Sequence, residues 1–157
     1  MKIGFIGTGQ ITKAVVTGIL GSRLKISKIY LSERNKKISK NLKSKSKKIV
    51  IIKNNQEIIN KSNWVFLAVT PTVGNKILHK YYFKSNQTIV SFISTIKMKQ
   101  LKKIIKVKAK IVRAIPLPPI SLKKGPVPIF PPNKKVKNFF NHLGATVEIN
   151  KENSSLN

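Results

Sequence analysis

The chain has 157 residues, of which 41% are hydrophobic, and it carries 32 lysines and arginines against 4 acidic residues, for a net charge of +28. This length and hydrophobic content predict one globular domain with a real core and exclude a wholly disordered chain. The absence of cysteine excludes disulfides, thiolate nucleophiles and cysteine-based metal sites, and no apolar run approaches the roughly 20 residues of a membrane-spanning helix.

Hydrophobic runs alternate with amphipathic stretches through the first three quarters of the chain. The runs predict strands, and apolar residues at spacings of three and four predict helices. In chain order we expect a strand at Lys2–Ile6, a helix at Gln10–Leu20, a strand at Lys28–Leu31, a helix at Asn35–Leu42, a strand at Ile49–Ile52, a helix at Gln56–Lys61, a strand at Trp64–Val69, a helix from Pro71 to about Tyr82, a strand at Thr88–Ile93, a helix at Met98–Ile105 and a strand at Lys110–Ile115.

The pattern changes where most of the prolines occur. We expect there an extended loop at Pro116–Pro132 around one short strand at Val127–Phe130, then a helix at Val136–Leu143 capped by Gly144, and a last strand at Thr146–Ile149. Residues 151–157 are expected to form a frayed tail, so that the domain spans residues 1–150.

Strands that alternate with helices through short connections are typical of parallel sheets with right-handed crossovers. The predicted fold is therefore α/β, a Rossmann-type, doubly wound, mainly parallel sheet with helices on both faces. Ligands of such sheets bind at the carboxyl ends of the strands, near the point where the strand order reverses. The loops after the strands are accordingly the places to look for a site.

The first motif is Gly7-Thr8-Gly9-Gln10, which follows the first strand directly and opens the first helix. Gly7 allows a tight turn, Gly9 lets the backbone approach a pyrophosphate, and the helix offers free N–H groups to the phosphates. Thr12 replaces the third glycine of the usual dinucleotide-binding fingerprint, and we expect it to loosen the packing of helix on strand. The context of strand and helix favours cofactor binding over a plain turn.

The second motif lies at the end of the second strand, where the adenosine ribose of a dinucleotide should sit. Ser32 and Arg34 could hold a 2′-phosphate, Arg34 through a charge-assisted fork. Glu33 could instead bond a 2′-hydroxyl and favour NAD, although side chains alternate in direction and it can point away. We therefore favour NADP, with NAD possible. A solvated charged turn is the alternative reading.

Two further motifs end strands. Ala68-Val69-Thr70-Pro71 combines small residues with a proline that can turn the chain into the next helix. The segment from Arg113 to Pro119 places a strand end beside a stiff proline loop, and Arg113 either organises this loop or faces an anionic ligand, the first being favoured.

Together these pieces resemble the N-terminal NAD(P)-binding domain of pyrroline-5-carboxylate reductase over nearly the whole chain. Gly4-Phe5-Ile6-Gly7-Thr8-Gly9-Gln10 is similar to the start of that family, and Asn55-Gln56-Glu57 is similar to its Asn-x-Glu motif. Residues 68–71 resemble the family's Ala-Val-Lys-Pro, and residues 91–95 resemble its Ser-x-x-Ala-Gly. Residues 113–119, with Gly125, resemble its Arg-x-Met-Pro-Asn-Thr-Pro and the glycine that follows.

The resemblance implies hydride transfer from a nicotinamide cofactor to the C=N bond of 1-pyrroline-5-carboxylate, giving proline. The absence of cysteine separately leads us to expect a cytoplasmic location. It implies that Asn55 contacts the cofactor and that Ser94 lies near the nicotinamide. The implied cofactor-binding residues are Ile6, Gly7, Thr8, Gly9, Gln10, Ile11, Ser32, Arg34, Asn55, Ala68, Val69, Thr70, Pro71 and Ser94; no catalytic residue is assigned and no metal is expected.

The chain departs from the family in three places. Leu117 stands where the family has an asparagine, Ser94-Thr95 replaces its Ala-Gly pair, and the helical C-terminal domain that supplies the dimer and the substrate-binding residues has no counterpart in these 157 residues. We therefore keep a second hypothesis, a truncated remnant or a subunit that binds cofactor without turnover. A helical partner subunit or a homo-oligomer would complete the site.

The charge supports a third hypothesis, a polycation that binds nucleic acid. The lysines are scattered over the whole chain, and the only arginines are Arg23, Arg34 and Arg113. Because nucleic-acid sites favour arginine forks and stacking aromatics, we attribute the charge to biased composition and expect neither a specific nucleic-acid site nor a membrane partner. Strand-like sequence from Lys2 also leads us to expect no signal peptide.

Overall fold

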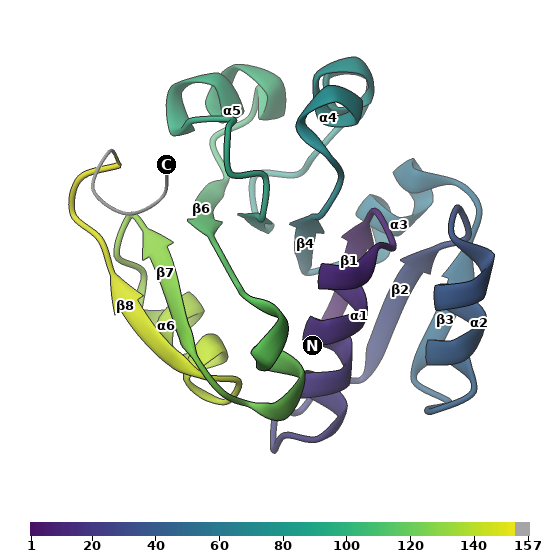
Figure 1. Cartoon of the computed structure of the whole chain (residues 1–157). Helices are drawn as coiled ribbons and strands as arrows, with labels where there is room; N and C mark the ends of the chain where they lie inside the picture. The colour runs from purple at the N-terminus through teal and green to yellow at the C-terminus, as the bar shows by residue number, and fades with distance from the viewer. Residues whose placement is uncertain (153–157) are drawn as a thin grey trace.

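In the computed structural model, residues 1–152 are described, and they form one sheet with helices on both faces (Figure 1). The strands are β1 (Lys2–Ile6), β2 (Lys28–Ser32), β3 (Ile49–Ile52), β4 (Trp64–Leu67), β5 (Thr88–Ser91), β6 (Lys110–Ala114), β7 (Pro126–Phe130) and β8 (Ala145–Glu148). The α-helices are α1 (Gln10–Leu20), α2 (Lys36–Lys43), α3 (Asn55–Lys61), α4 (Pro71–Ile77), α5 (Met98–Ile105) and α6 (Lys134–Asn141), and the 3₁₀ helices are η1 (Leu78–Lys80) and η2 (Pro118–Leu122).

The sheet has the strand order β3-β2-β1-β4-β5-β6-β7-β8. All neighbouring strands are parallel except β6 and β7, which pair antiparallel. The order reverses between β1 and β4, so the loops after these two strands diverge and leave room at their carboxyl ends. The predicted Rossmann-type, mainly parallel α/β fold is confirmed.

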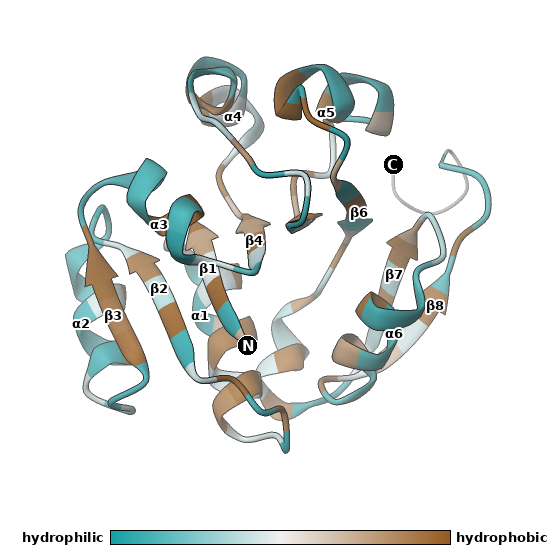
Figure 2. Ribbon diagram, turned by 180° about the vertical axis from the view of Figure 1, so that it is seen from behind, coloured by the Kyte–Doolittle hydropathy of each residue, from teal (hydrophilic) through white to brown (hydrophobic). Residues whose placement is uncertain are grey.

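Two hydrophobic cores lie on opposite faces of the sheet. On one face, Phe5 and Phe66 stack with ring centroids 4.6 Å apart, and Trp64 meets Phe139 of α6 at 5.0 Å. On the other face, α3, η1 and α5 cover the alternate strand residues, with Ile58, Leu78 and Leu101 among the buried side chains. Figure 2 shows the result: β3 is almost wholly hydrophobic, whereas α2 is largely hydrophilic. The period-two pattern of the strands thus builds both cores.

Several predicted bounds were wrong. The fourth, fifth and sixth strands end earlier than expected, at Leu67, Ser91 and Ala114, because the chain there leaves the sheet to form the loops at its carboxyl edge. The expected helix from Pro71 to about Tyr82 gives way to η1 after Ile77 and ends at Lys80. The bounds of the last helix and strand also lie one or two residues earlier than predicted.

The proline-rich stretch contains a short helix that its sequence pattern did not predict. It was predicted as an extended loop around one strand, yet η2 occupies Pro118–Leu122 and packs on α1. At Gly18 of α1 a Cβ atom would come within 2.5 Å of the carbonyl oxygen of Ile120. The close approach of helix and loop therefore depends on a glycine.

Residues 151 and 152, beyond the predicted domain boundary at residue 150, belong to the described structure. Glu152 lies in the segment expected to be a frayed tail, but its carboxylate forms an ion pair with the buried Arg113. The rest of that predicted tail, residues 153–157, lies outside the described residues. Within residues 1–152, no helix is long and apolar enough to cross a membrane.

Candidate functional site

The loop between β1 and α1 makes the tight bend that its glycines predicted. Gly7 has a φ of +104°, and a Cβ there would lie 2.5 Å from the carbonyl oxygen of Ala68, so no other residue fits without strain. A Cβ on Gly9 would meet nothing within 4 Å, so this residue faces open space. Gly9 also caps α1 without a side-chain hydrogen bond, which leaves the first N–H groups of the helix for a ligand.

Thr12 does not loosen the packing of α1 on β1, contrary to expectation. Its side chain is fully buried, and its hydroxyl donates a 2.8 Å hydrogen bond to the carbonyl of Gly7. The larger residue therefore fastens the bend to the first turn of α1.

Thr8 links this loop to the neighbouring strand. Its hydroxyl lies 2.9 Å from the carbonyl oxygen of Ser32 and 2.7 Å from the Ser32 hydroxyl. Both side chains are about 5% exposed. The Ser32 hydroxyl is thus already engaged with a protein partner, which leaves the nearby cations as the groups free to face an anion.

Two adjoining cavities surround the bend, of 670 Å³ and 370 Å³. Gly7, Arg34, Lys36 and Val69 line both. The larger also contains Thr8, Gly9, Asn35, Ala68, Thr70 and Val73; the smaller also contains Ser32, Glu33, Lys53, Asn55 and Ile77. Most of the predicted cofactor residues are therefore brought together at the reversal of strand order.

The end of β2 is positively charged, and Arg34 is exposed there beside Lys36. The carboxylate of Glu33, which is half-buried, lies 3.9 Å from the ammonium of the exposed Lys36, a long distance for an ion pair. Lys53 lines the smaller cavity from the end of β3. Lys36 and Lys53 could not be predicted as site residues, because single lysines in a lysine-rich chain carry no signal.

Asn55 lines the smaller cavity and carries a buried acceptor that has no partner among the described residues. Its Nδ2 donates to the Tyr81 hydroxyl at 3.0 Å, and its buried Oδ1 has no hydrogen-bond partner among the described residues. A buried carbonyl-type oxygen without a partner costs free energy, which a ligand donor would recover. Tyr81 was not predicted from sequence, since it is 26 residues away from Asn55.

The segment after β4 turns into α4 as its proline suggested. Thr70 caps α4, its Oγ1 accepting from the Val73 amide at 3.3 Å, and Pro71 occupies the first turn. Ala68 and Val69, predicted as strand, instead cross beneath the bend, where Ala68 donates to the Ile6 carbonyl at 2.8 Å. The two loops at the reversal point are thereby joined.

A third cavity, of 780 Å³, lies on the other side of the start of α1. Gln10 and Ile11 line it directly after Gly9, and Ser94 and Phe92 line it from the loop after β5. Its remaining walls come from Lys13, Ala14, Thr17, Lys45, Ile115, Pro116, Pro118 and Ser121. This arrangement gives a largely apolar chamber next to the glycine bend.

Two predicted site residues lie outside all three cavities. Ile6 is fully buried in the core, and Pro71 lines none of them. Their roles at a cofactor therefore stay predictions.

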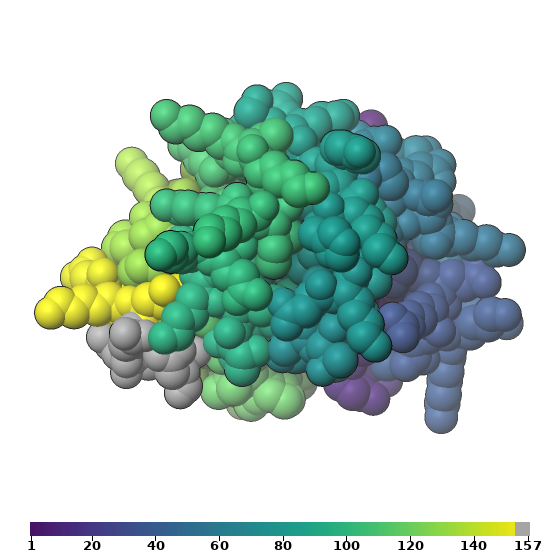
Figure 3. Space-filling model, turned by 90° about the horizontal axis from the view of Figure 1, so that it is seen from above, coloured from purple at the N-terminus to yellow at the C-terminus, as the bar shows by residue number. Residues whose placement is uncertain are grey.

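The lysines do not gather on one face. They are exposed on α2, on α5 and at the start of α6, and these helices cover both faces of the sheet. Long side chains also project on several sides of the view onto α4 and α5 (Figure 3). The charge therefore surrounds the molecule, whereas the glycine bend is local.

A family model described as "NADP oxidoreductase coenzyme F420-dependent" matches residues 2–97, which is more than half of the chain. The chain belongs to this family. The matched residues include the glycine bend, the end of β2, Asn55, the loop after β4 and Ser94. The chain is thus a pyridine-nucleotide-binding domain of an oxidoreductase family. No curated protein matches the chain.

Solved structures share the fold of this family member. A pyrroline-5-carboxylate reductase from Streptococcus pyogenes is 21% identical, with a TM-score of 0.80, over 95% of this chain and 58% of that one. A Plasmodium falciparum pyrroline carboxylate reductase with NADP bound is 23% identical, with a TM-score of 0.80, over 97% and 58%. One from Coxiella burnetii is 20% identical, with a TM-score of 0.81, over 96% and 59%.

The chain therefore spans somewhat less than three fifths of the length of these structures. Their likeness confirms the fold that the sequence resemblance implied.

Proposed function

We propose that this chain binds NADPH and forms the cofactor-binding half of a reductase that acts on a cyclic imine of the pyrroline-5-carboxylate type. The observation that carries the proposal is the glycine bend at the reversal of strand order, open toward a cavity that has cations at one end. The similarity to pyrroline-5-carboxylate reductases, one of them with NADP bound, supports the same cofactor and substrate class.

The residues present fit a dinucleotide. Gly9 provides the open space and the helix N-terminus that a pyrophosphate requires, and Gly7, Thr8 and Gln10 would complete that contact. The orphaned Oδ1 of Asn55 would accept from the adenosine half. When bound, the nicotinamide supplies the hydride, while Ile11 and Ser94 would shape the chamber around it.

The charge at the end of β2 favours NADP over NAD. Arg34 and Lys36 both line the larger cavity, and Lys53 adds a third cation to the smaller one. A 2′-phosphate would gain charge-assisted hydrogen bonds from these groups, with Arg34 able to form a planar fork. Ser32, which we had expected to share this role, has its hydroxyl paired with Thr8.

Titration with NADPH and NADH, followed by cofactor fluorescence at moderate salt, tests the proposal. We expect saturable binding that is at least about tenfold tighter for NADPH, and loss of that preference in Arg34→Ala, because the fork to the 2′-phosphate is gone. Arg23→Ala is the matched control, since Arg23 is exposed and lies outside the cavities. No saturable NADPH binding would overturn the proposal.

Turnover separates the reductase from its alternative, a domain that binds cofactor without catalysis. The 780 Å³ chamber has room for a small imine, yet the chain covers only 58% of the first reductase structure, and no residue of it is assigned to the substrate. Oxidation of NADPH with 1-pyrroline-5-carboxylate by the purified chain would support the reductase. Binding without turnover would support the alternative, and a helical partner subunit or a second copy would be the next addition to test. The cytoplasmic location stays a prediction.

A further inference from the structure

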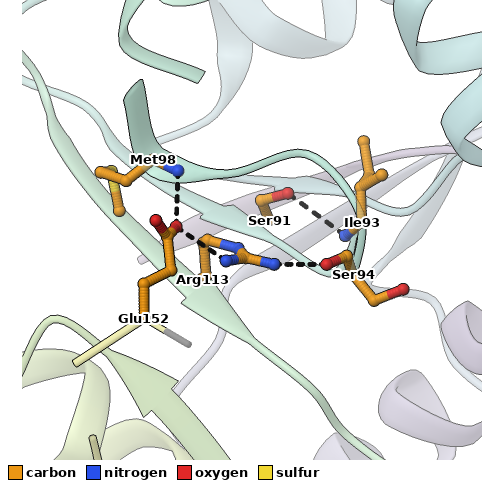
Figure 4. A network of polar contacts seen from close by, with 6 residues as sticks. All are labelled: Ser91, Ile93, Ser94, Met98, Arg113 and Glu152. Atoms are coloured by element: carbon orange, nitrogen blue, oxygen red, sulfur yellow. Dashed lines mark hydrogen bonds and ion pairs between the residues drawn. The ribbon is translucent and has the colours of Figure 1, made fainter. Parts of the chain in front are cut away.

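Arg113 is fully buried at the carboxyl end of β6 and is held by two partners from distant parts of the chain (Figure 4). Its Nη1 lies 2.7 Å from the Oε2 of Glu152, and its Nη2 donates to the carbonyl of Ser94. Its Nε has no partner among the described residues. The guanidinium thus bridges the segment after β8 and the loop after β5.

Besides its ion pair with Arg113, Glu152 also contacts the end of that loop directly. The Met98 amide, at the start of α5, donates to the same Oε2 at 2.6 Å. Lys97, the residue that precedes Met98, does not cap α5 with its side chain. A carboxylate at a helix N-terminus is stabilised by the helix dipole, so Glu152 takes the place of a local cap.

The loop from Ile93 to Met98 is therefore fixed at three points. The Ile93 amide donates to the Ser91 hydroxyl at 3.2 Å, the Ser94 carbonyl accepts from Arg113, and the Met98 amide donates to Glu152. Ser94 itself is exposed and lines the 780 Å³ chamber. The position of the chamber wall thus depends on a buried ion pair behind it.

No other carboxylate among residues 1–152 can replace Glu152. Glu33, Glu57 and Glu148 pair with surface lysines elsewhere in the chain. Without the Glu152 charge, the Arg113 guanidinium would be buried without a counter-ion, a costly state that is relieved by movement toward water. That movement would carry the Ser94 carbonyl with it.

We propose that Arg113 and Glu152 are positioning residues: through Ser94 and Met98, this pair holds the loop after β5 in the shape that orients the nicotinamide end of the cofactor. Glu152, in the segment that follows β8, is thereby coupled to the redox end of the site. The orientation of the nicotinamide rests on the proposed function, whereas the hold on the loop does not.

The hold on the loop is tested by amide hydrogen exchange in the full chain without nucleotide. In Glu152→Gln, which keeps the shape but removes the charge, we expect exchange in residues 93–98 to rise by about tenfold while the β1 and β4 amides stay unchanged. Glu148→Gln is the matched control, since it removes a carboxylate from the surface pair with Lys137. Unchanged exchange in residues 93–98 would overturn the proposal whether or not nucleotide binds.

The orientation is tested by comparing NADPH with adenosine 2′,5′-bisphosphate, which lacks the nicotinamide. In Glu152→Gln we expect NADPH to bind about tenfold more weakly and the bisphosphate to bind within about twofold of the parent chain, because only the redox end has lost its pre-organised wall. The positioning role would be overturned if both ligands bound equally more weakly to Glu152→Gln, or if the affinity for neither ligand changed. If the parent chain binds neither, the proposed function fails together with the orientation, and the exchange result still decides the hold on the loop.

Discussion

The hydroxyl oxygens of Thr8 and Ser32 lie 2.7 Å apart in a buried contact between the glycine bend and the end of β2. This pair holds the two loops that the proposed cofactor would contact at its pyrophosphate and at its ribose. It also explains why Ser32 sits in the predicted place without a free hydroxyl: the group that the sequence assigned to a ligand is used to build the site.

Thr8→Val should lower the free energy of unfolding by about 1–3 kcal/mol, because the isosteric change leaves the buried Ser32 hydroxyl and carbonyl without their partner. Thr17→Val is the control, since Thr17 donates only to the Lys13 carbonyl of its own helix and should cost less than about 0.5 kcal/mol. Urea unfolding measures both. Equal losses of unfolding free energy in the two variants would show that the contact between Thr8 and Ser32 does not stabilise the protein more than an ordinary hydrogen bond within a helix.

Gly7 and Gly9 should respond differently to alanine. Gly9→Ala places a methyl group in open space, so we expect it to change stability by less than about 1 kcal/mol while weakening NADPH binding by at least about tenfold. Gly7→Ala puts a Cβ against Ala68 at a φ of +104° and should cost about 3 kcal/mol of stability. Thermal unfolding and nucleotide titration of both variants give the comparison, and full NADPH affinity in Gly9→Ala would contradict the bend as a phosphate site.

Gln87 joins the start of β5 to the end of α3. Only 2% exposed, it donates to the carbonyls of Ile59 at 2.6 Å and Ser62 at 2.9 Å and accepts from the Lys84 amide at 2.8 Å. Gln87→Leu should cost about 3 kcal/mol, because three buried or part-buried backbone groups each lose a hydrogen bond.

Gln100→Leu makes the same chemical change at an exposed position, where Gln100 donates to Asn75, and it should cost less than about 0.5 kcal/mol. Denaturant titration of the two variants compares them directly. A small loss at Gln87 would mean that the released backbone groups find other partners.

The dispersed lysines should give DNA binding that depends on salt and not on sequence. We expect duplexes of different sequence to bind with affinities within about threefold of one another, and binding to vanish near physiological salt, because bulk charge releases counterions without reading bases. Fluorescence anisotropy across a salt series measures this. Sequence preference that persists at physiological salt would restore the nucleic-acid hypothesis.

The sequence predicted those features whose signal is local. The glycines of the bend lie between a buried strand and an amphipathic helix, and Pro71 marks the start of α4 because proline favours the first turn. Arg113 was favoured as a residue that organises the proline loop after its strand. Its side chain has a structural role, but the contacts join Glu152 to the Ser94 carbonyl of the loop after β5 and do not involve the proline loop.

Features that depend on distant partners could not be predicted. The side-chain amide of Gln56 donates to the Tyr82 carbonyl and accepts from the Tyr82 amide, each at 2.8 Å. The helix that was expected to reach Tyr82 therefore ends before this contact, at Lys80. The tail was expected to fray because no local pattern shows that Glu152 will meet a buried arginine 39 residues earlier in the chain. In each case the deciding contact joins segments whose proximity only the fold creates.

The absence of a side chain at Gly18 affects the size of the 780 Å³ chamber. The backbone of η2 seats against α1 only because residue 18 lacks a Cβ, and the same segment carries Pro118 and Ser121, which face the chamber. Any larger residue at this position would displace that segment and with it the far wall. The size of the chamber therefore depends on the absence of a side chain at Gly18, a residue that does not itself line the chamber.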